Sequence, residues 1–158
     1  MYNYAREVNN NKTAIITGSG RGIGREAAII LAKKSVNVVV CSRTFNEISS
    51  TVQEIKKEGC NSRILGIKCD VSIPSEVNSL VKLTIEKLGS KSIDILVNNA
   101  GVAFNKKLID TSEEEWDQTA NTNLKGAFNF TKAYPAVYDF KAVRSHIKCE
   151  LWCWQERL

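Results

Sequence analysis

The chain has 158 residues, of which 43% are hydrophobic and 25% charged, as in an ordinary globular protein that folds as one domain. Its formal net charge is +5, but the lysines are spread over amphipathic helices and form no basic stripe with interleaved aromatics, so we expect no nucleic-acid partner. No apolar run approaches the ~20 residues of a membrane span. The polar segment Met1–Asn11 has no signal-peptide core. We therefore expect a cytoplasmic protein without a membrane partner.

Apolar runs alternate with helical patterns along the chain, which is typical of a parallel sheet with crossover helices. The expected strands are Thr13–Thr17, Asn37–Cys41, Arg63–Lys68 and Ile93–Val97. The expected helices are Gly22–Lys34, Asn46–Glu58, Ser75–Leu88 after Pro74 in the first turn, one that starts at a capping box over Ser112–Glu115, and one over Asn123–Ala133. Gly59 is expected to end the second helix as a left-handed cap, and Gly89 is expected to end the third.

A glycine-rich turn, Thr17–Gly24, joins the first expected strand to the first expected helix. Such a turn points several backbone N–H groups at one spot, with the positive end of the helix dipole behind them, and so favours a bound phosphate or pyrophosphate. The spacing differs from the usual dinucleotide fingerprint, because three residues separate Gly18 from Gly22 and one separates Gly22 from Gly24. A glycine-rich turn without a ligand remains the alternative at this point.

A second motif, Asn98–Gly101 (Asn-Asn-Ala-Gly), follows the fourth expected strand. With Thr17–Gly24 it closely resembles the short-chain dehydrogenase/reductase family, and Asp70-Val71 and Asn123–Gly126 are further matches. The resemblance runs from about residue 13 to about residue 137, and the 3-oxoacyl-acyl-carrier-protein reductase branch looks most similar. It implies an α/β fold, a Rossmann-type doubly wound parallel sheet, of which the chain would supply about four strands and five helices. Ligands would bind at the carboxyl ends of the strands.

The resemblance also implies an activity, namely hydride transfer between a nicotinamide cofactor and a small carbonyl or alcohol substrate, such as a 3-oxoacyl thioester. Members usually assemble as homo-tetramers or dimers, partly through the helix around Asn123. Asp70 would hydrogen-bond the adenine amino group, although a strand-end turn residue is the plainer interpretation. Asn123 would be the catalytic residue that holds a water in the proton relay. The predicted cofactor-binding residues are Gly18, Ser19, Arg21, Gly22, Ile23, Gly24, Ser42, Arg43, Asp70, Val71, Asn98, Ala100 and Gly101.

The end of the second expected strand bears on the choice between NAD(H) and NADP(H). An acidic residue there would accept a hydrogen bond from the ribose 2′-hydroxyl and repel a 2′-phosphate, but Cys41–Thr44 contains none. Arg43 can pair with a phosphate through its planar fork, Ser42 can donate a hydrogen bond, and Arg21 can help. We therefore expect NADP(H) in preference to NAD(H). An Arg43 that caps a helix or faces solvent is the alternative.

The cysteines and the single histidine carry no strong metal signal. The five cysteines (Cys41, Cys60, Cys69, Cys149, Cys153) are odd in number and lack paired spacing, so reduced thiols are expected. His146, Cys149 and Cys153 could supply three zinc ligands, but no fourth ligand is obvious. We therefore expect no metal site.

The resemblance breaks off after residue 137. The family's serine, and its tyrosine and lysine four residues apart, would polarise the carbonyl and act as general acid, but the chain contains no Tyr-x-x-x-Lys. Back-translated and read one nucleotide further on, residues 149–154 permit Val-Ser-Ser-Gly-Val-Gly, in which the single tryptophan codon fixes both glycines. We therefore expect a polar extension (1–12), a partial NADP-binding domain (13–137) and a frame-shifted tail (138–158). Such a chain would be a nucleotide-binding fragment without normal activity, whereas a divergent short protein is the alternative.

Overall fold

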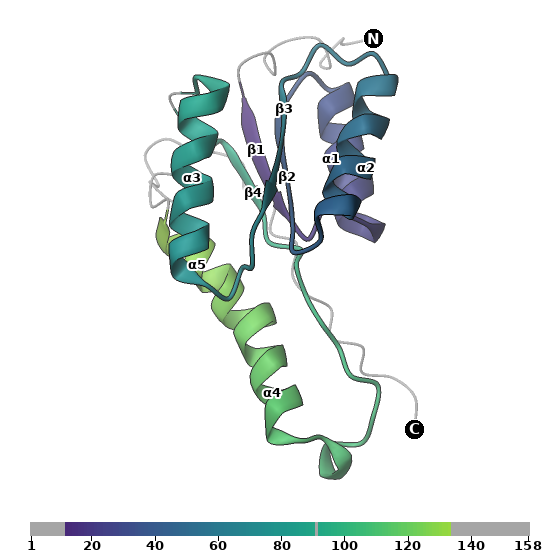
Figure 1. The fold of residues 1–158 in the computed structure, drawn as a ribbon, viewed down its shortest axis with the longest axis vertical. Helices are drawn as coiled ribbons and strands as arrows, with labels where there is room; N and C mark the ends of the chain where they lie inside the picture. Colours follow the sequence, from purple (N-terminus) through teal and green to yellow (C-terminus); the bar gives the residue numbers. More distant parts are fainter. Residues whose placement is uncertain (1–11, 91, 134–158) are drawn as a thin grey trace, which may run out of the picture.

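The computed structural model describes residues 12–90 and 92–133, in which four strands alternate with three α-helices and two further α-helices follow the last strand (Figure 1). The strands are β1 (Thr13–Thr17), β2 (Asn37–Ser42), β3 (Ile64–Lys68) and β4 (Ile95–Val97). The helices are α1 (Gly22–Lys33), α2 (Phe45–Lys57), α3 (Pro74–Leu88), α4 (Glu113–Thr119) and α5 (Gly126–Ala133), with a 3₁₀ turn η1 (Leu108–Asp110) and a π-helical segment η2 (Ala120–Lys125). The predicted bounds hold to within one residue except at the last strand and the last helix. The tail with His146, Cys149 and Cys153 lies outside the described residues.

The four strands form one parallel sheet in the order β3-β2-β1-β4. Helices α1 and α2 cover one face, and α3 and α5 cover the other (Figure 1). The predicted Rossmann-type doubly wound sheet is therefore confirmed. Because Thr17 pairs in register with Cys41, the carboxyl ends of β1 and β2 open at the same edge of the sheet.

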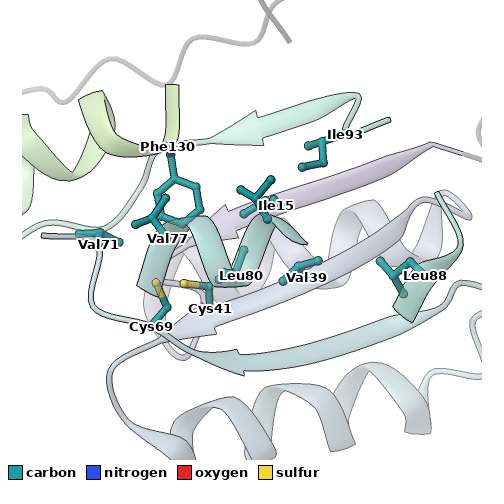
Figure 2. Close-up of a cluster of buried hydrophobic side chains, with 11 residues drawn as sticks. Ile15, Val39, Cys41, Cys69, Val71, Val77, Leu80, Leu88, Ile93 and Phe130 are labelled. Atoms are coloured by element: carbon teal, nitrogen blue, oxygen red, sulfur yellow. The ribbon is translucent and has the colours of Figure 1, made fainter. Parts of the chain in front are cut away.

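Two apolar clusters hold the helices on the sheet. Alternate side chains of the central strands point to opposite faces, so Ile15 and Val39 pack under α3 and α5 together with Leu80 and Phe130 (Figure 2). The intervening side chains pack under α1 and α2. All five residues of β1 are buried, as a sheet covered on both faces requires.

Strand β4 begins two residues later than the predicted strand Ile93–Val97, at Ile95. The Asp94 carboxylate explains the difference, because its Oδ2 accepts the Thr13 N–H at 2.8 Å in place of a backbone carbonyl. The Asp94 N–H in turn donates to the Thr13 carbonyl at 2.8 Å. Ile93 is nevertheless buried in the core. The segment therefore packs as predicted, although its first two residues are not in the ladder.

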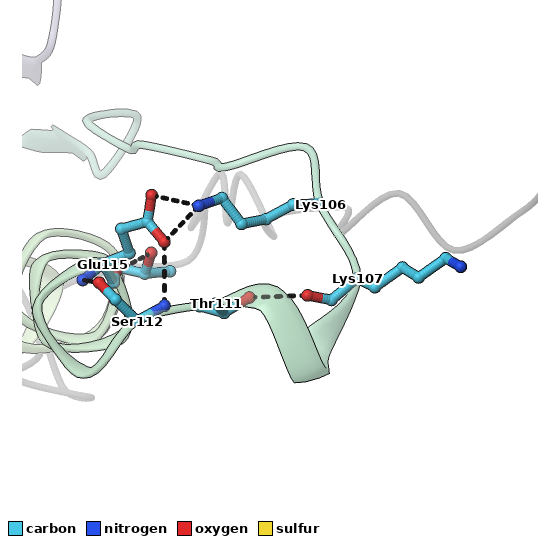
Figure 3. A network of polar contacts seen from close by, with 6 residues as sticks. Lys106, Lys107, Thr111, Ser112 and Glu115 are labelled. Atoms are coloured by element: carbon cyan, nitrogen blue, oxygen red, sulfur yellow. Dashed lines mark hydrogen bonds and ion pairs between the residues drawn. The ribbon is translucent and has the colours of Figure 1, made fainter.

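The predicted capping box opens α4 and is confirmed. The Ser112 hydroxyl accepts the Glu115 N–H at 3.3 Å, and the Glu115 carboxylate accepts the Ser112 N–H at 3.0 Å (Figure 3). Lys106 donates to the same carboxylate at 2.7 Å. The hydrogen bond from Lys106, followed by that from the Ser112 backbone, lowers the pKa of Glu115 below its usual value. This network holds the loop at Lys106 against the start of α4.

The prediction of a separate helix over Asn123–Ala133 was wrong in its beginning. The chain stays helical from α4 through η2 into α5, and Asn123 lies in the π-helical segment rather than at a helix start. Single π-helical turns inside α-helices occur frequently at functional sites. Among the described helices, none combines the length and the apolar character that would let it cross a lipid bilayer.

Candidate nucleotide-binding site

A cavity of about 480 Å³ lies at the carboxyl ends of the strands, a volume within the range of small-molecule sites. Its walls come from the glycine turn, the residues after β2, the residues after β3 and the motif after β4. Ten of the thirteen predicted cofactor-binding residues line it: Gly18, Arg21, Gly22, Ile23, Ser42, Arg43, Asp70, Val71, Ala100 and Gly101.

The glycine turn is closely packed at Gly18 and open at Gly22. Gly18 has φ +65°, and a Cβ added there would lie 2.8 Å from Ala100 Cα. Gly22 has φ +57°, and a Cβ added there would meet nothing within 4 Å. Both positions favour glycine because of the positive φ. The backbone at Gly22 can therefore be approached closely from the cavity, which fits a phosphate held by backbone N–H groups.

Three predicted residues, Ser19, Gly24 and Asn98, do not line the cavity. Ser19 is fully buried and ties the glycine turn to β2, since its N–H donates to the Cys41 carbonyl at 2.9 Å and its Oγ accepts the Cys41 N–H at 2.9 Å. Gly24 faces the turn from inside α1, and a Cβ there would lie 2.6 Å from the Gly18 carbonyl oxygen. Ser19 and Gly24 therefore shape the turn rather than the cavity wall.

Asn99 and Thr17, which were not predicted as site residues, brace the glycine turn. The hydroxyl of Thr17 accepts the N–H groups of Asn99 at 2.9 Å and Ala100 at 3.0 Å. The Asn99 amide donates to the carbonyls of Thr17 at 2.9 Å and Gly18 at 3.2 Å. These bonds lock the motif after β4 onto the turn after β1. The second asparagine of the motif was visible in the sequence, but its spacing gives no sign of this contact.

Asn98 and Asn123 line a second, small cavity of about 10 Å³ with Thr122. The Oδ1 atom of Asn98 is buried and accepts no hydrogen bond from any described residue. The Asn123 amide makes two hydrogen bonds to the backbone of Val102. Its Oδ1 accepts the Val102 N–H at 2.8 Å, and its Nδ2 donates to the Val102 carbonyl at 2.9 Å. Asn123 therefore positions the chain after the motif, and Val102 itself lines the larger cavity.

Asp70 is a turn residue after β3 that also lines the cavity. Its Oδ1 accepts hydrogen bonds from the Ser72 N–H at 2.9 Å and the Ser72 hydroxyl at 2.6 Å, as in a turn residue after a strand. The residue also lines the cavity. Its second carboxylate oxygen makes no hydrogen bond to the described part of the chain, so it remains available to a ligand.

An acidic side chain, Glu47, lies beside the end of β2. Arg43 lines the cavity and makes no ion pair with any described residue, whereas Ser42 donates to Glu47 Oε2 at 3.1 Å. The Arg21 Nε lies 3.7 Å from Glu47 Oε1. Glu47 was missed because it belongs to the first turn of α2, five residues beyond Ser42, rather than to the strand end.

Two free thiols, Cys41 and Cys69, lie side by side in the core at the ends of β2 and β3 (Figure 2). The hydrogen bond with Cys69, together with burial, raises the pKa of Cys41 well above its usual value. Cys69 also lines the cavity. Within the described ranges, no group of three or more His, Cys, Asp or Glu side chains is placed to hold a metal ion.

Fold and cavity together define the class of Rossmann-type folds: a doubly wound parallel sheet with a glycine turn at the mouth of a ligand-sized cavity. The chain belongs to the short chain dehydrogenase family, whose sequence profile matches residues 12–142.

Similar proteins agree with this assignment. The 3-oxoacyl-acyl-carrier-protein reductase FabG of Staphylococcus epidermidis is 40% identical over 120 residues, which are 75% of this chain and 48% of that protein. BbsD, a hydroxy(phenyl)methylsuccinyl-CoA dehydrogenase subunit of Thauera aromatica, is 40% identical over 123 residues, 78% of this chain and 48% of that protein. A crystal structure of an actinorhodin polyketide ketoreductase variant with NADPH superimposes with a TM-score of 0.73 at 33% identity, covering 80% of this chain and 47% of that one. The chain thus spans about half the length of the relatives it matches.

Proposed function

We propose that this protein is an oxidoreductase that transfers hydride between NADP(H) and a carbonyl or alcohol substrate. The observation that carries the proposal is the glycine turn, which is open at Gly22 and lines a cavity of about 480 Å³ in a chain of the short chain dehydrogenase family. When bound, the cofactor would supply the hydride donor or acceptor.

The residues around the cavity suit the parts of such a cofactor. The backbone N–H groups at Gly22 and the N-terminus of α1 would hold the pyrophosphate. Asp70, with one carboxylate oxygen unused, would accept a hydrogen bond from the adenine amino group, beside Val71. Ala100 and Gly101 would line the ribose, with Asn98 beneath them. Arg43, which has no described ion partner, would bind a 2′-phosphate through its planar fork. The Arg43 guanidinium is the group that favours NADP(H) over NAD(H).

The substrate we propose is a 3-oxoacyl thioester. Two relatives at 40% identity carry an acyl-carrier-protein or a coenzyme A thioester in their names. The test is NADPH oxidation by the purified chain with acetoacetyl-CoA, followed at the nicotinamide absorbance band. Turnover that depends on Arg43 would support the proposal. If the chain binds neither NADPH nor NADH, the proposal is overturned.

A second candidate is a nucleotide-binding protein without turnover. It is favoured by one observation, that the 158 residues contain no Tyr-x-x-x-Lys. Micromolar binding of NADPH without oxidation would support it. Resequencing the gene from codon 130 to well past codon 158 separates the two candidates. A restored frame with serine and Tyr-x-x-x-Lys would favour the reductase, and the same short frame would favour the binding protein.

We further propose that the protein assembles as a homo-dimer or tetramer in the cytoplasm. The support is the apolar surface of the helical path from α4 to α5, where Trp116, Leu124 and Phe128 are 61%, 75% and 58% exposed. Isolated surface apolar residues are ordinary, but a cluster on one path marks an interaction site. Light scattering of the purified chain would report a mass above that of one 17.6 kDa protomer.

A further inference from the structure

The carboxylate of Glu47 lies at the part of the cavity that the positive side chains make suitable for a phosphate. Glu47 lines the cavity together with Arg21, Ser42 and Arg43. It accepts the Ser42 hydroxyl at 3.1 Å and lies 3.7 Å from the Arg21 Nε, and its side chain is one-third exposed. An acidic group is therefore in contact with two of the three side chains expected to bind a 2′-phosphate.

Close packing holds Glu47 in this place. A Cβ added to Gly20 would lie 2.7 Å from Glu47 Cβ and 3.0 Å from Ser42 Cβ, so the glycine turn and the first turn of α2 are pressed together. The Thr51 hydroxyl donates to the Gly20 carbonyl at 3.1 Å and fastens the same contact one helical turn further on. The carboxylate thus belongs to the cavity wall rather than to the solvated face of α2.

The contacts of Glu47 conflict with phosphate binding at the same place. A serine hydroxyl has one proton to donate, and in this structure Ser42 donates it to Glu47. The carboxylate also partly neutralises Arg21, and it would repel a phosphate dianion placed beside it. A ribose 2′-hydroxyl meets no such opposition, because it can itself donate to a carboxylate.

We propose that Glu47 is a specificity-determining residue: it weakens the binding of nucleotides that carry a 2′-phosphate. It thereby brings the affinities for NADP(H) and NAD(H) closer together than Arg43 and Ser42 alone would make them. This inference rests on the proposed nucleotide binding. It adds an acidic residue, contributed by α2 rather than by the strand end, that counteracts the arginine beside it.

The test compares two small probes, adenosine 2′,5′-bisphosphate and adenosine 5′-monophosphate, by calorimetric titration of the full chain. The variant is Glu47→Gln, which keeps the shape of the side chain and an acceptor for Ser42. The matched control is Glu58→Gln, which removes the same charge at the far end of α2, where Glu58 pairs with Lys33 at 2.9 Å. Thermal unfolding of all three proteins checks that they are equally folded.

We expect Glu47→Gln to bind the bisphosphate about fivefold more tightly, as removal of one partly exposed like charge allows. The affinity for the monophosphate should change by less than about twofold. The gain should shrink in about 1 M salt, where charges are screened within about 3 Å. A packing role alone would not depend on salt, and Glu58→Gln should show no gain.

Two contrary outcomes are distinguishable. If the parent chain binds the bisphosphate and Glu47→Gln binds it equally or more weakly, Glu47 does not oppose the 2′-phosphate and instead supports Arg21 and Ser42. That result overturns this inference and leaves the proposed function intact. If the parent chain and both variants bind neither probe, the proposed nucleotide binding itself fails, and the role of Glu47 fails with it.

Discussion

Gly126 at the start of α5 lies directly against Val71, in the segment that follows β3. A Cβ added to Gly126 would lie 2.5 Å from Val71 Cγ2 and 3.0 Å from Val71 Cβ. On the next turn of α5, the buried Asn129 amide donates to the Val71 carbonyl at 2.9 Å. Val71 also lines the candidate site. Helix α5 therefore fixes one wall of the cavity without reaching into it.

Replacing Gly126 by valine should destabilise the fold. The added side chain must displace Val71, and overpacking of this kind costs about 1–3 kcal/mol. Urea unfolding should show a lower midpoint for Gly126→Val. The matched control is Lys125→Val, at the neighbouring exposed position on the same helical path, which should unfold close to the parent. Equal midpoints for Gly126→Val and the parent would mean that α5 does not pack on Val71.

The two positive-φ glycines of the turn should respond differently to alanine. Gly18→Ala combines left-handed strain, about 1–2 kcal/mol, with a clash against Ala100, so it should lower the thermal midpoint clearly. Gly22→Ala carries similar strain but meets no neighbour within 4 Å. Its stability loss should be the smaller, while NADPH binding, measured by fluorescence titration, should weaken because the methyl group screens the backbone. A Gly22→Ala variant that binds NADPH as tightly as the parent would contradict a phosphate at this turn.

Arg43 should decide how strongly the chain prefers NADPH over NADH. Loss of one charge-assisted hydrogen bond to a 2′-phosphate corresponds to about tenfold in affinity. Arg43→Ala should therefore weaken NADPH binding about tenfold and leave NADH binding nearly unchanged. Lys57→Ala, at the C-terminal end of α2, removes the same charge away from the cavity and serves as the control. An equal loss for both cofactors would indicate that Arg43 does not contact the 2′-phosphate.

The raised pKa of Cys41 should make the fold sensitive to alkaline pH. The folded chain keeps this thiol protonated above its usual value of 9.0, so the stabilisation is complete below that pH and is lost as the pH rises toward the folded-state pKa. The free energy of unfolding should fall above about pH 9, by at most about 1.4 kcal/mol per pH unit from this group. Cys41→Ala should show a flatter decline between pH 8 and pH 10, measured by urea unfolding. Parallel declines would assign the pH dependence to other groups.

Local sequence signals were enough to predict the sheet and most of the cavity. Apolar β-branched runs such as Asn37–Cys41, ended by polar residues, indicate buried parallel strands, and the glycine turn indicates where a phosphate would bind. Contacts between segments far apart in the sequence could not be predicted. Asn123 lies in a π-helical segment and binds Val102, 21 positions earlier. Asp94 replaces a strand carbonyl at Thr13, 81 positions away.

The same limit explains two contacts around the site that the sequence did not reveal. Ser19 belongs to a motif that suggests ligand contact, but the register of β2 beside β1 brings the Cys41 backbone to it first. Glu47 resembles any other acidic residue in the first turn of a helix. Only the close approach of α2 to Gly20 turns it toward the cavity. Tertiary packing therefore decides which polar side chains remain available to a ligand.

The bracing of the glycine turn means that its shape is preorganised. Thr17 and Asn99 fix it to the motif after β4, and the buried Ser19 fixes it to β2. A nucleotide bound at Gly22, as proposed, would meet a turn that is already ordered, and its binding would not have to offset the entropy of folding a loop. Association should accordingly be a single step whose rate grows in proportion to nucleotide concentration, without a slower conformational phase.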